Sequence, residues 1–409
     1  MSRKQSNLKK IKSLCYLTLG GSLSYQIIYF KKDFNGYYDN VLQPLSQQLN
    51  PEWAHKIGVS AIKYGLFPTE NFEDPKVLNT KFLKYELSNP IGIAAGFDKH
   101  GDAITGLRNI GFSVVEIGSI TPEPQPGNPK PRVFRLPEDN AVINRYGFNS
   151  EGHKEVYEKI KNIDKALLQN GMLGVNLGKN KTSNDAVQDY SLGIKKFHNI
   201  ADYFVINISS PNTPGLRSLQ NKNELQELLA GVNRTLNTLE GGKRPPLLLK
   251  LAPDLTLEEM KDIVSVITKK ETKVDGLIIS NTTIERPSLI NQEFSNEIGG
   301  LSGKPLTNKS TDVIRTMYKL TKGSIPIIGV GGVFTGQDAY EKILAGASVV
   351  QIYTALIYHG PPVVTKIKSE LAQLLLKDGY NDVSSAVGKV LTYLQLAATK
   401  RRFWIFFKE

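Results

Sequence analysis

Residues 207–217 place amides, hydroxyls and prolines close together, in a segment that could bind or transform a small polar molecule. The apolar run at 203–206 predicts a buried strand, so these groups follow where that strand ends. Pro211 and Pro214 restrict the backbone path, and asparagine amides offer donors and acceptors to a flat heterocycle. Ser210 is the candidate reactive hydroxyl. An Asx or serine turn that caps a helix has the same composition, so this segment alone leaves both interpretations open.

The elements that must position this segment are eight short apolar runs, at 91–95, 113–117, 173–177, 203–208, 247–251, 276–280, 325–330 and 349–353. They are nearly continuous in Val, Ile and Leu, as expected for parallel strands covered on both faces. Helical patterns lie between several of them, at 223–239, 257–269, 311–320 and 336–345. The alternation predicts an α/β fold, a (β/α)8 TIM barrel, whose sites lie at the C-terminal ends of its strands. A loop of about 55 residues separates the second and third runs.

Polar or glycine residues follow the predicted strands at one edge of the barrel, in the segments 95–99, 118–121, 176–180, 207–217, 280–283, 329–333 and 353–355. Gly331, Gly332 and the pair 353–354 match the usual phosphate site of a barrel, and 299–303 is a second glycine-rich loop. Together they predict a bound cofactor that carries a phosphate. Lys250 interrupts the fifth run, where a buried lysine is costly unless it faces an anion. A salt bridge inside the barrel is the alternative.

A second group of polar residues is rich in amides: Asn144, Asn207, Asn212 and Asn281, with Thr282 and Lys99. Such a set would bind a planar ligand that bears amides and a carboxylate. Segment 144–149 lies in the long loop and could fold over the barrel mouth. Asp98 and His100 are the nearest acid–base candidates. A turn or an ion pair explains Asp98 equally well, and a surface position explains His100.

Composition and charge exclude several classes of protein. The single cysteine of the 409 residues excludes a disulfide framework, and the five histidines lack the H-x-x-H spacing of zinc hydrolases. The net charge is +12, of which residues 1–32 contribute +7 and residues 389–409 contribute +4, leaving +1 for the 356 residues between them. A nearly neutral body argues against nucleic-acid binding.

Both ends of the chain predict contact with a membrane. The basic, acid-free segment 1–32 predicts mitochondrial targeting, and its 17-residue apolar run at 14–30 predicts a single membrane anchor. A secretory signal and a disordered arm are the alternatives. The tail 389–409 combines basic and aromatic residues, which suits an anionic lipid surface, and a frayed tail is the competing interpretation. Amphipathic helices are predicted within 34–68, as a lid or as an interfacial element.

The motifs at 94–99, 144–150, 176–182, 207–217 and 299–306 strongly resemble those of dihydroorotate dehydrogenase, and most closely its membrane-associated, quinone-reducing class. The resemblance covers roughly residues 35–388. It implies an FMN-dependent barrel that oxidises (S)-dihydroorotate to orotate in de novo pyrimidine (UMP) biosynthesis, with ubiquinone as the electron acceptor. It further implies a location at the mitochondrial inner membrane, and we expect a monomer.

The resemblance also implies roles for individual residues. Ser210 resembles the base that removes the C5 proton while the C6 hydride passes to the flavin, and Thr213 and Phe148 resemble the residues that shield it and relay its proton. The cytosolic class carries cysteine at that position. The implied substrate contacts are Lys99, Asn144, Arg145, Tyr146, Gly147, Phe148, Asn207, Asn212, Asn281 and Thr282. The implied FMN contacts are Ala94, Ala95, Gly96, Lys99, Gly118, Ser119, Asn176, Asn207, Lys250, Ser280, Ser302, Gly303, Gly331, Gly332, Tyr353 and Thr354.

By the same resemblance the chain divides into four parts: a targeting and anchor segment at 1–32, a helical quinone-tunnel domain at 33–70, the FMN barrel at 71–388, and the tail 389–409. The implied quinone contacts are Gln47, His55, Arg135 and Tyr353. Two other functions compete with this one. Another FMN barrel, such as a 2-hydroxy-acid oxidase, would need a histidine base beside the flavin. The other is an inactive, membrane-tethered scaffold, which would not need to retain Ser210, Lys99, Lys250 and the asparagines.

Overall fold

A closed barrel of eight parallel strands is the main element of the fold. The computed structural model describes residues 3–164, 171–240 and 244–389. The barrel strands follow one another in chain order: β3 (Ile91–Ile93), β4 (Val114–Ile120), β7 (Met172–Leu177), β8 (Tyr203–Asn207), β9 (Leu247–Leu251), β10 (Gly276–Ile279), β12 (Ile327–Val330) and β13 (Ala347–Ile352). Each of the eight predicted runs overlaps one of these strands, so the predicted (β/α)8 barrel is confirmed.

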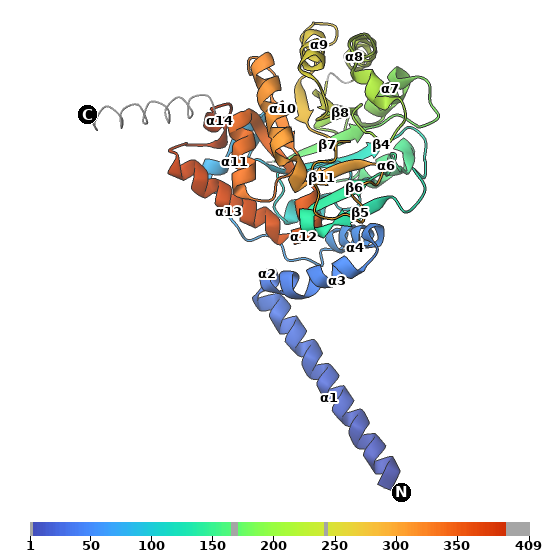
Figure 1. Ribbon diagram of the computed structural model, residues 1–409, viewed down its shortest axis with the longest axis vertical. Coiled ribbons are helices and arrows are strands. Elements are labelled where there is room, and N and C mark those ends of the chain that lie inside the picture. Colours follow the sequence, from blue (N-terminus) through green and yellow to red (C-terminus); the bar gives the residue numbers. More distant parts are fainter. Residues whose placement is uncertain (1–2, 165–170, 241–243, 390–409) are drawn as a thin grey trace, which may run out of the picture. The chain divides into compact units, whose positions relative to one another are not determined.

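Helices cover the outside of the barrel (Figure 1). They are α5 (Ile104–Asn109), α6 (Gly152–Ile160), α7 (Ala186–Phe197), α8 (Lys222–Asn237), α9 (Leu257–Ile267), α10 (Thr307–Leu320), α11 (Gly336–Ala345), α12 (Thr354–His359), α13 (Pro362–Lys377) and α14 (Val383–Ala386). Capping boxes fix three of the starts: Thr256 with Glu259 at α9, Thr335 with Asp338 at α11, and Asp382 with Ser385 at α14. Because helices pack on the outside and side chains fill the inside, most strand residues are buried.

A hairpin of β1 (Thr80–Phe82) and β2 (Tyr85–Leu87) packs against the interior of the barrel. Phe82 and Leu87 join one apolar cluster with barrel residues such as Met172 and Tyr203, which begin their strands. The hairpin therefore packs at the N-terminal end of the barrel, opposite the end where the predicted functional residues lie. A short 3-10 helix, η2 (Lys76–Leu78), precedes it.

The segment between β4 and β7 is not a plain loop, which differs from the prediction. It holds α6 and two strands, β5 (Val133–Leu136) and β6 (Ala141–Asn144), joined by the 3-10 turn η3 (Pro137–Asp139). The predicted glycine-rich loop at 299–303 likewise contains a strand, β11 (Gly300–Gly303), which pairs with β6. These strands are only four residues long, too short for an apolar pattern to reveal them.

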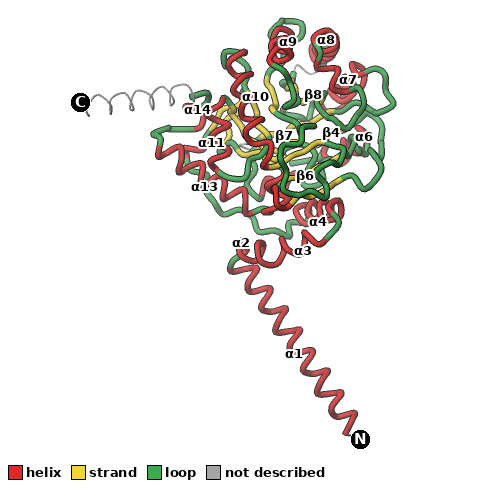
Figure 2. The backbone as a smooth tube through the Cα atoms, in the orientation of Figure 1, coloured by secondary structure: helices red, strands yellow, loops and turns green. Residues whose placement is uncertain are grey.

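The β5–β6–β11 sheet has two different faces. Ile143 and Leu301 pair across it and enter a small apolar core with Phe134 and Leu289. Because side chains alternate along a strand, Asn144 and Ser302 lie on the opposite face. The 3-10 turns η6 (Lys304–Leu306) and η5 (Leu216–Gln220) follow β11 and β8, respectively. Figure 2 shows this sheet and the barrel strands in yellow, with the connecting loops in green.

The chain divides into two compact units, Met1–Asn50 and Pro51–Glu409, which are described separately. The first contains α1 (Arg3–Lys32), α2 (Phe34–Tyr37), a π-helical turn η1 (Tyr38–Leu42) and α3 (Gln43–Gln48). Helix α4 (Pro51–Lys63) starts at the predicted proline and belongs to the second unit. The unit boundary therefore falls inside the predicted domain 33–70, whose role in quinone binding stays a prediction.

The predicted anchor run at 14–30 lies within α1. None of the helices in the described residues has both the length and the apolar character needed to span a bilayer. Of the predicted tail 389–409, all but the first residue lies outside the described residues, so its lipid contact stays a prediction.

Removing the Phe82 side chain should destabilise the barrel, because the ring is fully buried among barrel residues. We expect Phe82→Ala to lower the free energy of unfolding by about 3–5 kcal/mol. Lys81→Ala, on the exposed side of the same strand, is the control. Urea unfolding curves measure both variants, and equal midpoints would contradict a structural role for the hairpin.

Candidate active site

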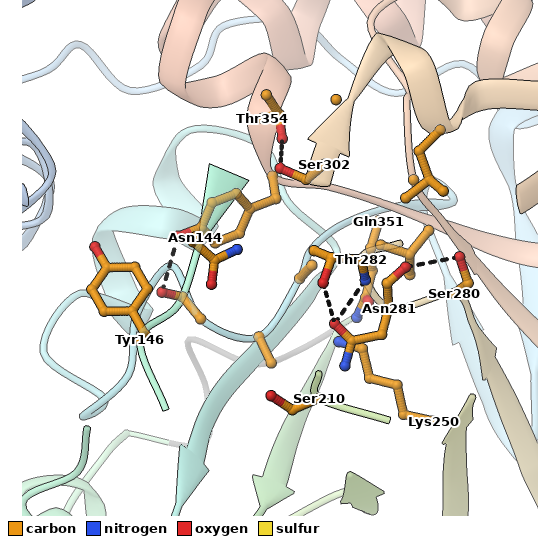
Figure 3. Close-up of a pocket in the computed structure, with 18 of the residues that line it drawn as sticks. Asn144, Tyr146, Ser210, Lys250, Ser280, Asn281, Thr282, Ser302, Gln351 and Thr354 are labelled. Carbon is orange, nitrogen blue, oxygen red and sulfur yellow. Dashed lines mark hydrogen bonds between the residues drawn. The ribbon is translucent and has the colours of Figure 1, made fainter. Parts of the chain in front are cut away.

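A cavity lies at the C-terminal ends of the barrel strands. Its walls come from the ends of β3, β4, β8, β9, β10, β12 and β13 and from the β6–β11 strand pair. The lining residues leave about 1030 Å³ of space between them, a figure that includes open solvent at the mouth. Figure 3 shows Ser302 beside Thr354 in one part of the cavity, and Ser210, Lys250 and Asn281 in another.

Most of the predicted site residues line this one cavity. They are Ala94, Ala95, Gly96, Lys99, Ser119, Asn144, Tyr146, Gly147, Phe148, Asn207, Ser210, Asn212, Lys250, Ser280, Asn281, Thr282, Ser302, Gly303, Gly331, Gly332, Tyr353 and Thr354. The lining also includes residues to which the sequence assigned no individual contact: Asn149, Leu306, Val330, Val333, Phe334, Gln351, Ile352 and Ala355. Segments from distant parts of the chain thus meet at the edge that the strand ends predicted.

Other predicted residues lie outside the lining. Gly118, Asn176 and Thr213 are buried behind it. Arg145 points elsewhere, because its guanidinium pairs with Glu297 at 2.5 Å and lies 4.6 Å from the centre of the Phe134 ring. The alternation of side chains beyond β6 explains this placement, since the neighbouring Asn144 faces the cavity. His55 and Arg135 do not line the cavity, and Gln47 belongs to the first unit.

A chain of side-chain hydrogen bonds connects the cavity with a carboxylate inside the barrel. The amide of Asn281 donates to Asn207 Oδ1 at 3.3 Å, and the amide of Asn207 donates to Ser119 Oγ at 2.8 Å. Ser119 donates to Asn176 Oδ1 at 2.5 Å, and the amide of Asn176 donates to Glu116 Oε1 at 2.9 Å. All four donors therefore point toward Glu116.

Glu116 fixes the orientation of this chain. An ionised carboxylate only accepts hydrogen bonds, so Asn176 must present its NH2 group to Glu116 and its oxygen to Ser119. The same requirement passes through Ser119 to Asn207 and then to Asn281, whose oxygen is left to accept from the Thr282 backbone at 2.8 Å. The positions of the NH2 group and the oxygen are therefore fixed in Asn207 and Asn281, the two side-chain amides of this hydrogen-bond chain at the cavity surface.

The same carboxylate neighbours the Lys250 ammonium, 3.9 Å away. Both side chains are buried, with exposed fractions of 6% for Lys250 and 0% for Glu116. Burial lowers the pKa of Lys250 below its ordinary value, and the charge of Glu116 opposes that shift. Tyr203 and Gln351 also donate to Glu116, at 3.2 and 2.8 Å. The salt-bridge interpretation of Lys250 and its position in the cavity wall therefore both hold.

Lys99 is a second cation in the cavity wall. Its Nζ donates to the carbonyl of Gly96 at 2.9 Å and lies 4.3 Å from the centre of the Tyr146 ring. Burial lowers the pKa of Lys99 to about 8; Arg132 adds to the shift, while Glu52 opposes it. An anionic ligand would meet a partly desolvated positive charge here.

Ser210 lies at the cavity surface and is mostly buried. Its Oγ accepts a hydrogen bond from the backbone N–H of Asn212 at 3.3 Å. Phe148, which has a left-handed backbone conformation (φ 53°), also lines the cavity. Its backbone is held by Gln125, which donates to the Phe148 carbonyl at 2.8 Å. A hydroxyl and an aromatic ring from different loops thus face the same space.

Asp98, His100 and His55 all lie outside the cavity lining. Asp98 accepts from the backbone N–H groups of Asp102 and Ala103 at 2.9 and 2.8 Å, as the turn interpretation predicts. His100 is partly exposed and lies outside the cavity lining, which is compatible with the surface interpretation. His55 bonds to the carbonyl of Phe97 through Nε2 at 2.9 Å, and its ring stacks 6.5 Å from that of Tyr353, at the cavity wall.

Three comparisons with known proteins point to one family. The family model described as dihydroorotate dehydrogenase matches residues 77–375. The mitochondrial dihydroorotate dehydrogenase (quinone) of Mus musculus is 50% identical, over 95% of this chain and 99% of the mouse protein. The dihydroorotate dehydrogenase (quinone) of Parvibaculum lavamentivorans is 49% identical, over 85% of this chain and 97% of its own length. A ligand-free DHODH crystal structure from Eimeria tenella superposes with a TM-score of 0.80 at 43% identity, over 83% of this chain and 99% of that one.

These relatives make the chain an oxidoreductase related to the quinone-dependent enzymes. This chain belongs to the dihydroorotate dehydrogenase family.

Neutralising Glu116 should destabilise the protein, because it leaves Lys250 as an uncompensated buried charge. We expect Glu116→Gln to lower the free energy of unfolding by about 3–5 kcal/mol. Glu86→Gln is the control, since that carboxylate is 78% exposed and pairs with Lys81 at 3.7 Å, and we expect it to change the free energy by less than about 1 kcal/mol. Adding Lys250→Met to Glu116→Gln should restore part of the loss. Additive effects in this double-mutant cycle would show that the two charges do not interact.

Proposed function

We propose that this protein oxidises (S)-dihydroorotate to orotate in pyrimidine biosynthesis, with FMN as its cofactor and a quinone as its electron acceptor. The observation that carries the proposal is the single cavity with two chemically different parts. One part presents Ser210, Lys99 and four asparagine amides, and the other presents glycines and the hydroxyls of Ser302 and Thr354. The family membership of the chain supports the same activity.

The residues present fit FMN. Gln351 lines the cavity, and its buried Oε1 has no hydrogen-bond partner among the described residues, so it suits an N–H donor on a bound ring. Gly303, Gly331 and Gly332 have positive φ angles and border the cavity, which allows their backbone to approach a phosphate closely. Lys250 would hold the pyrimidine end of the flavin ring. When bound, FMN would supply an acceptor for the two electrons of the substrate, which then pass to the quinone.

The amide-rich part of the cavity would hold the substrate. Lys99 would pair with its carboxylate, and Asn144, Asn207, Asn212 and Asn281 would bind the edges of its planar ring. Because the hydrogen-bond chain from Glu116 fixes the Asn207 and Asn281 amides, they meet the ring without first reorienting.

Ser210 would take the proton from C5 of the substrate. A serine hydroxyl is a weak base, but the backbone N–H of Asn212 donates to its oxygen and stabilises negative charge that develops there. Having taken a proton, the hydroxyl must pass its own proton on, and Thr213 and Phe148 are the predicted relay and shield. Low access of water suits this role, since Ser210 and Thr213 are 7% and 5% exposed.

The quinone and the membrane complete the proposal. We assign the quinone contacts of the second unit to His55, Arg135 and Tyr353; the His55 ring stacks on that of Tyr353, which lines the cavity. The contact predicted for Gln47, in the first unit, stays a prediction. The relatives from mouse and rice are mitochondrial. A location at the mitochondrial inner membrane, with residues 1–32 as targeting segment and anchor and an anionic lipid surface as partner, fits the basic N-terminus. We expect the protein to act as a monomer.

A 2-hydroxy-acid oxidase is the less favoured function. Its chemistry would need a histidine base beside the cofactor, and none of the histidines lines the cavity. An inactive scaffold is also less favoured, because the predicted polar residues converge on one cavity.

The proposal is tested by anaerobic mixing of the FMN-loaded protein with dihydroorotate, followed by a short-chain ubiquinone or by fumarate. We expect flavin absorbance to bleach on the first addition and to recover with ubiquinone alone. Absence of bleaching would contradict the substrate, and recovery with fumarate would contradict the quinone.

In the same experiment Ser210→Ala should retain FMN and bleach about 10²–10⁴-fold more slowly, because the proton acceptor is lost. Ser218→Ala, an exposed serine in the segment that follows, is the control and should bleach at the normal rate. A normal rate for Ser210→Ala would place the base elsewhere.

Orotate affinity should depend on pH through Lys99. The charged form binds the carboxylate and predominates below the pKa of about 8, so affinity should fall as pH rises above about 8, by at most about tenfold per unit. Lys99→Met should bind more weakly and lack this decline. Titrations of flavin absorbance with orotate measure both, and parallel curves would exclude Lys99 as the titrating group.

A further inference from the structure

Another buried lysine, Lys342, lies behind the cavity rather than in its wall. Lys342 on α11 has no exposed surface. Its Nζ donates to three uncharged oxygens: the Thr307 carbonyl at 3.2 Å, Ser310 Oγ at 3.0 Å and Thr311 Oγ1 at 2.9 Å. A buried cation held only by neutral groups is costly unless an anion compensates it.

Two of the residues that hold Lys342 donate hydrogen bonds to the turn at Val330–Gly332, which borders the cavity. Ser310 Oγ donates to the Val330 carbonyl at 2.5 Å, and Thr307 Oγ1 donates to the Gly332 carbonyl at 2.7 Å. Gly332 has φ 70°, and a Cβ on it would lie 2.2 Å from Thr307 Oγ1. The turn therefore packs closely against the first residues of α10. Only the Ser310 side chain separates the Lys342 ammonium from the Val330 carbonyl.

The part of the cavity that borders the Val330–Gly332 turn has uncharged walls. Its lining comprises glycines, Ser302 and Thr354. The lysines that line the cavity, Lys99 and Lys250, come from the ends of β3 and from β9, and Lys250 already faces Glu116. A phosphate dianion bound by backbone N–H groups and hydroxyls would thus need a positive charge from behind the wall.

We propose that Lys342 is a positioning residue for the cofactor phosphate, whose charge it compensates through the Val330–Gly332 turn. This inference rests on the proposed FMN cofactor. Lys342 does not touch the ligand. It acts through Ser310 and Thr307, which hold the turn, and through its electrostatic potential in a poorly hydrated part of the protein.

The proposed role of Lys342 predicts that the affinity for FMN depends on pH. Burial lowers the pKa of Lys342 to about 7, while Asp338, Glu341 and Asp312 oppose the shift and Lys304 adds to it. From α13, Glu370 accepts from the Gly336 backbone at 2.7 Å, and β12 and β13 carry no ionisable side chain. A bound dianion raises this pKa, so the ligand binds together with a proton above about pH 7. Affinity for FMN should therefore decline as pH rises above about 7, by at most about tenfold per unit.

The experiment compares FMN with riboflavin, which has the same ring without the phosphate. The full-length chain, freed of cofactor, is titrated by flavin fluorescence between about pH 7 and 9, where the phosphate stays a dianion because its second pKa is about 6. We expect the decline for FMN and not for riboflavin. Lys342→Met should bind FMN roughly tenfold more weakly at pH 7 and lose the decline, with riboflavin affinity unchanged. Lys319→Met, which removes an exposed charge in the last turn of α10, away from the residues that hold Lys342, is the control and should resemble the unaltered protein.

Each result has one meaning. Equal pH dependence for FMN and riboflavin in the unaltered protein would overturn the inference without any variant. Equal loss of both ligands in Lys342→Met would make the lysine merely structural, which also overturns it. If the unaltered protein binds neither flavin, the proposed cofactor itself is wrong.

Discussion

The ion pair of Glu116 with Lys250 inside the barrel is the interaction on which the rest of the site depends. A carboxylate at this depth needs a full set of partners, and Glu116 has them in Asn176, Tyr203, Gln351 and Lys250. These residues come from different strands, so the pair links the interior of the barrel to the cavity floor. Burial, the charge of Glu116 and the hydrogen bond to it raise the pKa of Tyr203 far above its ordinary value, so that Tyr203 remains a donor.

Positive charge is distributed over the cavity in three different ways. Lys99 stands against an aromatic ring at the wall, Lys250 stands beside a carboxylate, and Lys342 is held by hydroxyls and a carbonyl behind a turn. Each is desolvated, and burial lowers the pKa of each. A cavity built in this way favours ligands that bring negative charge with them, and it does so without raising the net charge of the protein surface.

The barrel could be predicted because its strands are buried on both faces. A run such as Leu247–Leu251 carries an apolar signal that turn residues interrupt at each end. The polar residues after these runs then converge, because parallel strands end at one edge. The β5–β6–β11 sheet and the β1–β2 hairpin escaped prediction, since strands of three or four residues carry too short a pattern.

Glu116, Gln351 and Lys342 also escaped prediction, although the first two had a signal. A charged or amide side chain within a run that must be buried requires a partner, and Glu116 and Gln351 interrupt such runs. Lys342 lies in the predicted helix 336–345, where a lysine is ordinary. What the sequence could not supply was the identity of the partners. Glu116 and Gln351 are 235 positions apart, and only the closed barrel brings them within 2.8 Å.

The pairing of β6 with β11 has a consequence for how this family can change in length. Gly300 pairs with Asn144 and Ser302 with Val142, so that Asn144 and Ser302 share a face. Inserting or deleting one residue within either strand would exchange the two faces. Both polar groups would then turn into the small apolar core, and Ile143 and Leu301 would turn into the cavity. Length variation is therefore tolerable in the turn at Pro137–Asp139 and in the loop 284–299, which are where insertions should accumulate among relatives.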